Sequence, residues 1–166
     1  ELVVATFEKK VILLKYDKDQ LNQFNPWLAT FVKPHHFFAE WERDYFVNFL
    51  ESYASEHPYF VVIINGELVA CGGYEKEDES VTLSWGMVKR DLHGQGIGRK
   101  LFNYRLSRIT KEYHGLSMQI DTSQHTKKFY EKCGFVAYKI EKDGYDLGLD
   151  KVYMRYSVLG LNNTHL

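Results

Sequence analysis

Cysteine is scarce in the chain, and neither of its two cysteines lies in a metal-binding pattern. Cys71 and Cys133 stand far apart and form no CxxC pair. Disulfide frameworks and zinc sites need closely patterned cysteines, so we predict free thiols and a reducing, cytoplasmic location. The histidines His35, His36 and His57 lack the carboxylate scaffold of a metal centre, so no metal is expected.

The sequence also lacks a charge excess and a long apolar run. Its formal net charge is −1, from 21 basic and 22 acidic residues, which gives no basic footprint for nucleic acid or an anionic membrane. No apolar segment approaches the roughly 20 residues that span a bilayer. We therefore expect neither nucleic-acid nor membrane partners, and any bound anion must be held by local geometry.

The composition and the order of the predicted elements favour one compact domain over residues 1–166. Hydrophobic residues make up 45% of the chain and aromatic residues 16%, which is enough for a sizeable core. Residues 1–10 are interpreted as an additional N-terminal segment without an assigned function. No internal repeat or linker divides the rest, and the C-terminal strand leaves room for pairing across a homodimer.

Strands are predicted where β-branched and aliphatic residues cluster, and helices where apolar residues recur every three to four positions. The order predicts an α/β (α+β) fold, in which a mixed, mostly antiparallel, twisted sheet of about six or seven strands is flanked by about four helices. The predicted strands are 11–16, 59–64, 67–74, 81–88, 116–120, 135–140 and 151–159. The predicted helices are 17–31, shortened or kinked at Pro26, then 39–55, 96–111 and 123–133.

The most informative segment is rich in glycine. The residues from Lys89 to Leu106 read KRDLHGQGIGRKLFNYRL, with Gly94, Gly96 and Gly98 directly before a helix. Free N–H groups and the dipole at a helix N-terminus attract phosphate oxygens, and glycines let a diphosphate approach them. The spacing matches neither the P-loop, GxxxxGK(S/T), nor the dinucleotide fingerprint, GxGxxG. The local sequence alone also allows a simple tight turn.

Two longer motifs follow each other in the second half of the chain. The first, WGMVKRDLHGQGIGRKLF over 85–102, joins a strand ending in valine to a glycine loop and a helix. The second, DTSQHTKKFYEKCGFVAYKI over 121–140, places an FY pair on a short helix before a GF turn and a strand. Together they resemble the GNAT superfamily of acetyl-CoA-dependent N-acyltransferases. The resemblance covers about 59–156 and implies a single-domain GNAT-like fold.

The resemblance implies that the protein transfers an acetyl group from acetyl-CoA to a primary amine of a small molecule or peptide. The backbone of 95–100 would hold the pyrophosphate, and Met87 and Val88 would pair with the pantetheine arm like an added strand. Tyr130 would form a hydrogen bond with the sulfur and protonate the departing thiolate. The implied coenzyme-binding residues are Met87, Val88, His93, Gly94, Gln95, Gly96, Ile97, Gly98, Arg99, Lys100 and Ser123.

Three positions depart from the family pattern. His93 stands where glutamine or arginine is usual, Ser123 where many members have asparagine, and Thr82 where many carry a glutamate as general base. A protein without a base could instead be a non-catalytic module that binds or senses acyl-CoA, and this is the alternative function. The base is left open between three ionisable residues, Glu75, Asp121 and His114, a water relay, and no dedicated base at all.

Several residues have more than one interpretation. By spacing alone Tyr130 is also a plausible core aromatic, and Cys133 lacks a partner histidine, so we interpret it as a packing residue and expect direct attack in a ternary complex. A bulge is predicted near Trp85-Gly86, because glycine within a strand often marks a kink. Arg99, Lys127 and Lys128 either meet the 3′-phosphate or form a solvated face. An aromatic set is interpreted as mostly core, with some rings lining an acceptor cleft: Trp27, Phe31, Phe37, Phe38, Trp41 and Tyr45.

Overall fold

The computed structural model describes residues 2–6, 9–28 and 42–156, in which strands and helices follow one another as predicted except for one additional strand at the start. The strands are β1 (Leu2–Thr6), β2 (Lys9–Lys15), β3 (Tyr59–Ile64), β4 (Glu67–Lys76), β5 (Ser80–Val88), β6 (Ser117–Thr122), β7 (Val136–Asp146) and β8 (Leu149–Tyr156). The helices are α1 (Leu21–Leu28), α2 (Glu42–Ser52), α3 (Ile97–Glu112) and α4 (Lys127–Lys132), with 3-10 turns η1 (Lys18–Gln20), η3 (Ala54–Glu56) and η4 (Arg90–Leu92).

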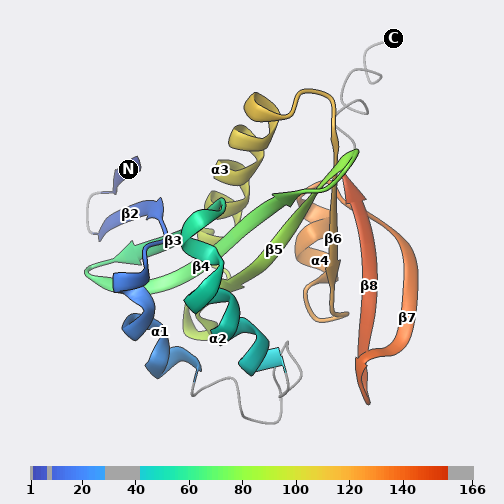
Figure 1. Ribbon diagram of the computed structural model, residues 1–166, viewed down its shortest axis with the longest axis horizontal. Helices are drawn as coiled ribbons and strands as arrows, with labels where there is room; N and C mark the ends of the chain where they lie inside the picture. The colour runs from blue at the N-terminus through green and yellow to red at the C-terminus, as the bar shows by residue number, and fades with distance from the viewer. Residues whose placement is uncertain (1, 7–8, 29–41, 157–166) are drawn as a thin grey trace.

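The strands form one mixed sheet in the order β1-β2-β3-β4-β5-β6-β8-β7 (Figure 1). Neighbouring strands are antiparallel except β5 and β6, which run parallel because α3 crosses over between them. The predicted mixed, mostly antiparallel sheet with four helices is therefore confirmed. Within the described residues the sheet has eight strands, because the segment 1–10 contains β1, which pairs with β2 and extends the edge beyond the expected seven.

Local sequence signals explain most of the element boundaries. Asn65 and Gly66 connect β3 to β4 with positive φ angles of 51° and 81°, which confirms the predicted tight hairpin. Pro26 lies inside α1, which ends two residues later. The second predicted helix is shorter than expected, because η3 follows the end of α2 at Ser52; its predicted beginning, 39–41, lies outside the described residues.

The sheet is buried on both faces by two separate hydrophobic clusters. In β3, Phe60 and Val62 belong to the cluster that α3 and α4 cover, whereas Val61 belongs to the cluster that α1 and α2 cover. Alternate residues of one strand thus point to opposite cores. Burial of one such side chain contributes about 1.5–3 kcal/mol. The sheet is therefore a rigid platform between two helical layers (Figure 1).

Candidate active site

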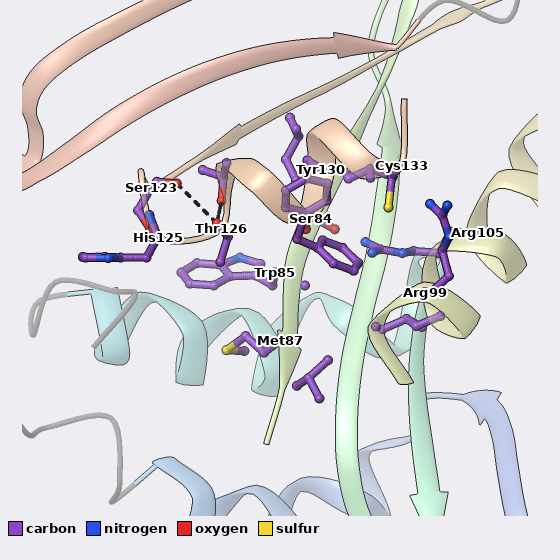
Figure 2. A pocket seen from close by; sticks show the side chains of 18 of the residues that line it. Ser84, Trp85, Met87, Arg99, Arg105, Ser123, His125, Thr126, Tyr130 and Cys133 are labelled. Atoms are coloured by element: carbon purple, nitrogen blue, oxygen red, sulfur yellow. Dashed lines mark hydrogen bonds between the residues drawn. The ribbon is translucent and has the colours of Figure 1, made fainter. Parts of the chain in front are cut away.

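A cavity of about 760 Å³ opens where β5 and β6 separate. The two strands pair only through 80–82 and 117–119, so the rest of β5 has no strand partner on this side among the described residues. The cavity is lined by β5, the loop before α3, α3 itself, β6 and α4, as the close view in Figure 2 shows. An extended ligand can enter here and pair with the exposed main chain of β5.

The glycine loop leaves main-chain donors unpaired at one wall of this cavity. Gly94 and Gly96 have φ angles of 78° and 80°, and Gly96 is the N-cap of α3. The first helical bond runs from Lys100 N–H to Gly96 O, over 3.1 Å. Among the described residues, the N–H groups of 96–99 have no main-chain acceptor, whereas that of Lys100 is occupied. The unpaired donors and the helix dipole suit phosphate oxygens.

Gly98 has a different task from the two glycines before it. A Cβ atom at this position would lie 3.2 Å from a ring carbon of Phe129 in α4 and 3.4 Å from Cγ2 of Val88 in β5. The missing side chain therefore lets the first turn of α3 pack closely against both elements. The alternating glycines combine two requirements: a left-handed backbone in the loop and a close approach in the helix.

The bulge predicted near Trp85-Gly86 is present in β5. The register between β4 and β5 shifts between Cys71 and Gly73, so that two residues of β5 fall opposite one of β4. Trp85 has a φ of 41°, and its carbonyl oxygen accepts a hydrogen bond from the hydroxyl of Tyr59 over 2.9 Å. This kink aims the backbone of β5 into the cavity at its centre.

Tyr130 of α4 places its hydroxyl directly against the bulge. The ring is buried, and a Cβ atom built on Gly86 would lie 3.2 Å from the phenol oxygen. Burial raises the pKa of Tyr130, while the charge and hydrogen bond of Arg105 oppose that rise. The phenol is therefore protonated at neutral pH and can act as a proton donor at the middle of the cavity.

Arg105 of α3 is a site residue that sequence reasoning missed. Only 2% of it is exposed, it lines the cavity, and its Nη1 donates to Gly73 O over 3.2 Å. Its Nε has no hydrogen-bond partner. The sequence does contain a signal for it, namely a charged residue at an apolar position of a helix. Arg105 lies four residues after Leu101 and four before Ile109, on the apolar face of α3. A charged residue on such a face requires a specific environment.

Another part of the wall carries carboxylates. Glu42 of α2, Glu75 of β4 and Asp121 of β6 line the cavity. The hydroxyl of Tyr145, also at the wall, donates to Asp121 Oδ2, and burial together with this carboxylate raises the pKa of Tyr145. Of the three candidate bases, the structure brings Glu75 and Asp121 to the cavity, whereas His114, beyond the end of α3, does not line it.

Most of the implied coenzyme-binding residues meet at this cavity. His93 places its Nε2 2.8 Å from Val88 O, and Ser123 is buried at the end of β6. Gln95 and Lys100 do not line the cavity. The implied residues that line it are Met87, Val88, His93, Gly94, Gly96, Ile97, Gly98, Arg99 and Ser123.

The cations proposed for the 3′-phosphate separate into two groups. Arg99 lines the cavity, and so does Lys132, which the sequence did not single out. Lys127 instead lies 3.4 Å from Glu131 in an ion pair on the surface of α4. Lys128 is exposed and does not reach the cavity wall either.

Two rings of α2 that do not belong to the predicted acceptor set, and that do not line the cavity themselves, pack against Trp85 of its wall. The ring of Phe46 lies 5.0 Å from that of Trp85 and the ring of Phe49 lies 6.3 Å from it, measured between centroids. Tyr45 is 65% exposed and does not line the cavity. The remaining members of the predicted set, Trp27, Phe31, Phe37, Phe38 and Trp41, lie outside the part of the chain whose side chains are described.

Neither cysteine nor histidine forms a reactive or metal-binding centre in the described residues. Burial raises the pKa of the Cys71 thiol to about 12 and also raises that of Cys133, so both are protonated at neutral pH. No group of three or more potential ligands occurs in 2–6, 9–28 or 42–156. The ring of His57 stacks on that of Tyr53, with 3.4 Å between their centroids. His35 and His36 lie outside the described residues.

Replacing Cys133 by alanine is therefore expected to leave at least half of the wild-type kcat. The thiol is neutral and packs in the cluster beside α4, so its loss removes some packing but no reacting group. The measurement is the kcat of the Cys133→Ala variant relative to that of the wild type. A loss of more than about 100-fold would instead assign Cys133 a covalent role.

Most of the chain matches the model of a known protein family. Residues 16–158 match the family model described as the acetyltransferase (GNAT) domain. The chain belongs to the GNAT acetyltransferase family. Membership in this family implies an acyltransferase. A search of the curated proteins finds no match to this GNAT domain.

Solved structures of low sequence identity share the fold of this GNAT domain. An N-acetyltransferase from Staphylococcus aureus Mu50 is 16% identical, with a TM-score of 0.70 over 90% of this chain and 98% of that one. Ard1 from Thermoplasma volcanium is 14% identical, with a TM-score of 0.70 over 89% and 97%. A Bacillus anthracis protein in complex with acetyl coenzyme A is 16% identical, with a TM-score of 0.53 over 60% and 61%.

Proposed function

We propose that this GNAT domain transfers an acetyl group from acetyl-CoA to a primary amine of a small molecule or peptide. The observation that supports it is one cavity that joins unpaired N–H groups at the start of α3, the free edge of β5 and the phenol of Tyr130. A diphosphate, an extended amide-containing arm and a thioester need these three features in that order.

The coenzyme would be held mainly by the main chain. The donors of 96–99 would bind the pyrophosphate, because their N–H groups have no internal partner. The edge of β5 at Met87 and Val88 would pair with the pantetheine arm, since β6 has already diverged. Arg99 and Lys132, which line the cavity, would meet the 3′-phosphate. No helix in the described residues is both long and apolar enough to cross a bilayer.

The reaction would proceed by direct attack in a ternary complex. The neutral amine attacks the thioester carbonyl, main-chain donors at the bulge receive the developing oxyanion, and the thiolate leaves with a proton from Tyr130. The amine loses its proton to Glu75, to Asp121 or to water. No covalent acyl-enzyme is needed, because the buried thiol of Cys133 is neutral.

A thiol-release assay with acetyl-CoA tests this function. The acceptor panel consists of spermidine, glucosamine, lysine and a peptide with a free N-terminus, and binding of coenzyme A is measured by calorimetry. Release that depends on one of these amines supports the proposal. Binding of coenzyme A without release by any amine favours the alternative, a sensing module, because Thr82 stands where the family often has its base. The absence of both would refute the coenzyme site.

A further inference from the structure

The cavity contains a buried cation to which the reaction above assigns no task. The guanidinium of Arg105 lines the wall, yet 2% of the residue is exposed. In the described part of the chain no carboxylate forms an ion pair with it, and its Nε has no hydrogen-bond partner. A buried charge without a counter-ion destabilises a fold, so a packing role alone does not explain this residue.

The groups around Arg105 are weak acids in their neutral form. Burial raises the pKa of Tyr59, Cys71, Tyr130 and Cys133, and the positive charge of Arg105 opposes the rise in each case. At neutral pH none of them carries the negative charge that would balance the guanidinium. None of these four side chains therefore serves as the counter-ion of Arg105.

Two glycines create the space in which the guanidinium lies. A Cβ atom on Gly72 would lie 3.0 Å from Nη1 of Arg105, and one on Gly86 would lie 3.5 Å from both Nη1 and Nη2. The same atom on Gly86 would lie 3.2 Å from the hydroxyl of Tyr130. Guanidinium and phenol therefore converge on one glycine of the bulge, from α3 and α4 respectively (Figure 2).

We propose that Arg105 is a positioning residue that acts through Tyr130. Its guanidinium holds the phenol at the bulge and stabilises the phenolate that forms when Tyr130 protonates the leaving group. This inference rests on the proposed acetyl transfer. It adds Arg105, which lies in neither of the two sequence motifs, to the residues that act in that reaction. Its support is the convergence on Gly86, the burial of Arg105 and the absence of a paired carboxylate.

The step balances in atoms and charge. The amine nitrogen forms a bond to the carbonyl carbon, the carbon–sulfur bond breaks, and its electron pair stays on sulfur. The hydroxyl proton of Tyr130 moves to that sulfur, which leaves a phenolate beside the Arg105 guanidinium. The proton lost by the new amide then returns through water to the phenolate. Acetyl-CoA and the amine give the amide and coenzyme A, and both side chains regain their starting states.

A double-mutant cycle tests whether Arg105 acts through Tyr130. We expect Arg105→Met to lower kcat on the order of tenfold, with KM for acetyl-CoA within about twofold of wild type. In a Tyr130→Phe background the same change should cost less than about twofold, because the group that it assists is gone. Arg105→Lys keeps the charge and should lose less than the methionine variant. The acceptor is the amine of the panel above that gives the fastest release.

The melting temperature of the variants distinguishes a role of Arg105 in catalysis from a role in stabilising the fold. Methionine has a similar length and no charge, so Arg105→Met should keep or raise Tm while kcat falls. A lower Tm, together with equal losses of kcat in both backgrounds, would overturn the proposal. Should the methionine variant not fold, the cycle with Arg105→Lys decides in the same way: additive losses contradict the inference and non-additive losses support it.

A titration without turnover tests the inference separately from the acetyl transfer. In protein labelled with fluorotyrosine, the Tyr130 signal is assigned by its absence in Tyr130→Phe and is followed by fluorine NMR against pH. Removing the guanidinium in Arg105→Met should move its titration to higher pH, because a neighbouring cation favours the phenolate. An unchanged titration would refute the role of Arg105, even where the wild type proves to be an active acetyltransferase. A shifted titration in a protein that releases no thiol would refute only the transfer.

Discussion

Replacing Tyr130 by phenylalanine is expected to reduce kcat for amine-dependent thiol release by about 100-fold, the usual contribution of a positioned general acid. The phenol is buried against the bulge and protonated at neutral pH, so in the proposed reaction it would donate a proton to the departing sulfur. The ring itself remains, so packing against Phe129 and Phe135 is kept. The measurement is steady-state kinetics with acetyl-CoA as the varied substrate.

A matched control is available in Tyr156 of β8. This tyrosine is also buried and packs on Phe102 and Phe135, but it does not line the cavity. Tyr156→Phe should therefore leave kcat within about twofold of wild type. For Tyr130→Phe, KM for acetyl-CoA should change little, because the proposed coenzyme contacts are made mainly by the main chain. A Tyr130 variant with wild-type kcat would exclude the phenol as the acid.

Local sequence signals predicted the parts of the site that depend on the backbone. Gly94 and Gly96 were identified from their position before a helix, and both adopt the left-handed conformation. The bulge followed from Gly86 inside a strand. These features are local because a turn or kink needs particular residues at particular positions along the chain. The single parallel strand pair was predicted similarly, from the crossover helix between β5 and β6.

The remaining parts depend on contacts between distant segments, which no local pattern records. Arg105 becomes part of the site because Gly72 and Gly86, on two different strands, leave room for its guanidinium. The exclusion of His114 from the cavity follows from where α3 ends relative to β6. The occupied N–H of Lys100 depends on which residue begins the helix, a boundary that sequence patterns place only to within a few residues.

Gly73 of β4 has important neighbours on two sides. On the side of β3, it lies directly opposite Tyr59 in the strand register. Towards α3, the carbonyl of Gly73 accepts the hydrogen bond of Arg105. The glycine pair of β4 thus connects the packing of the core to the charged group beneath the bulge. Stability and activity should therefore respond together to a change at Gly73, in contrast to Tyr130.

Replacing Gly73 by alanine is expected to lower the free energy of unfolding by about 3 kcal/mol, the upper part of the range for overpacked sites. A Cβ atom there would lie 2.2 Å from Pro58 O and 3.0 Å from Tyr59 Cα, and backbone atoms cannot move aside as the end of a side chain can. The measurement is urea unfolding followed by circular dichroism. Gly115→Ala is the comparison, because that glycine has a φ of 79° and open space around it. Its cost should be the backbone strain alone, about 1 kcal/mol. Equal decreases in the free energy of unfolding of the two variants would show that the backbone around Gly73 accommodates the added methyl group without a steric penalty.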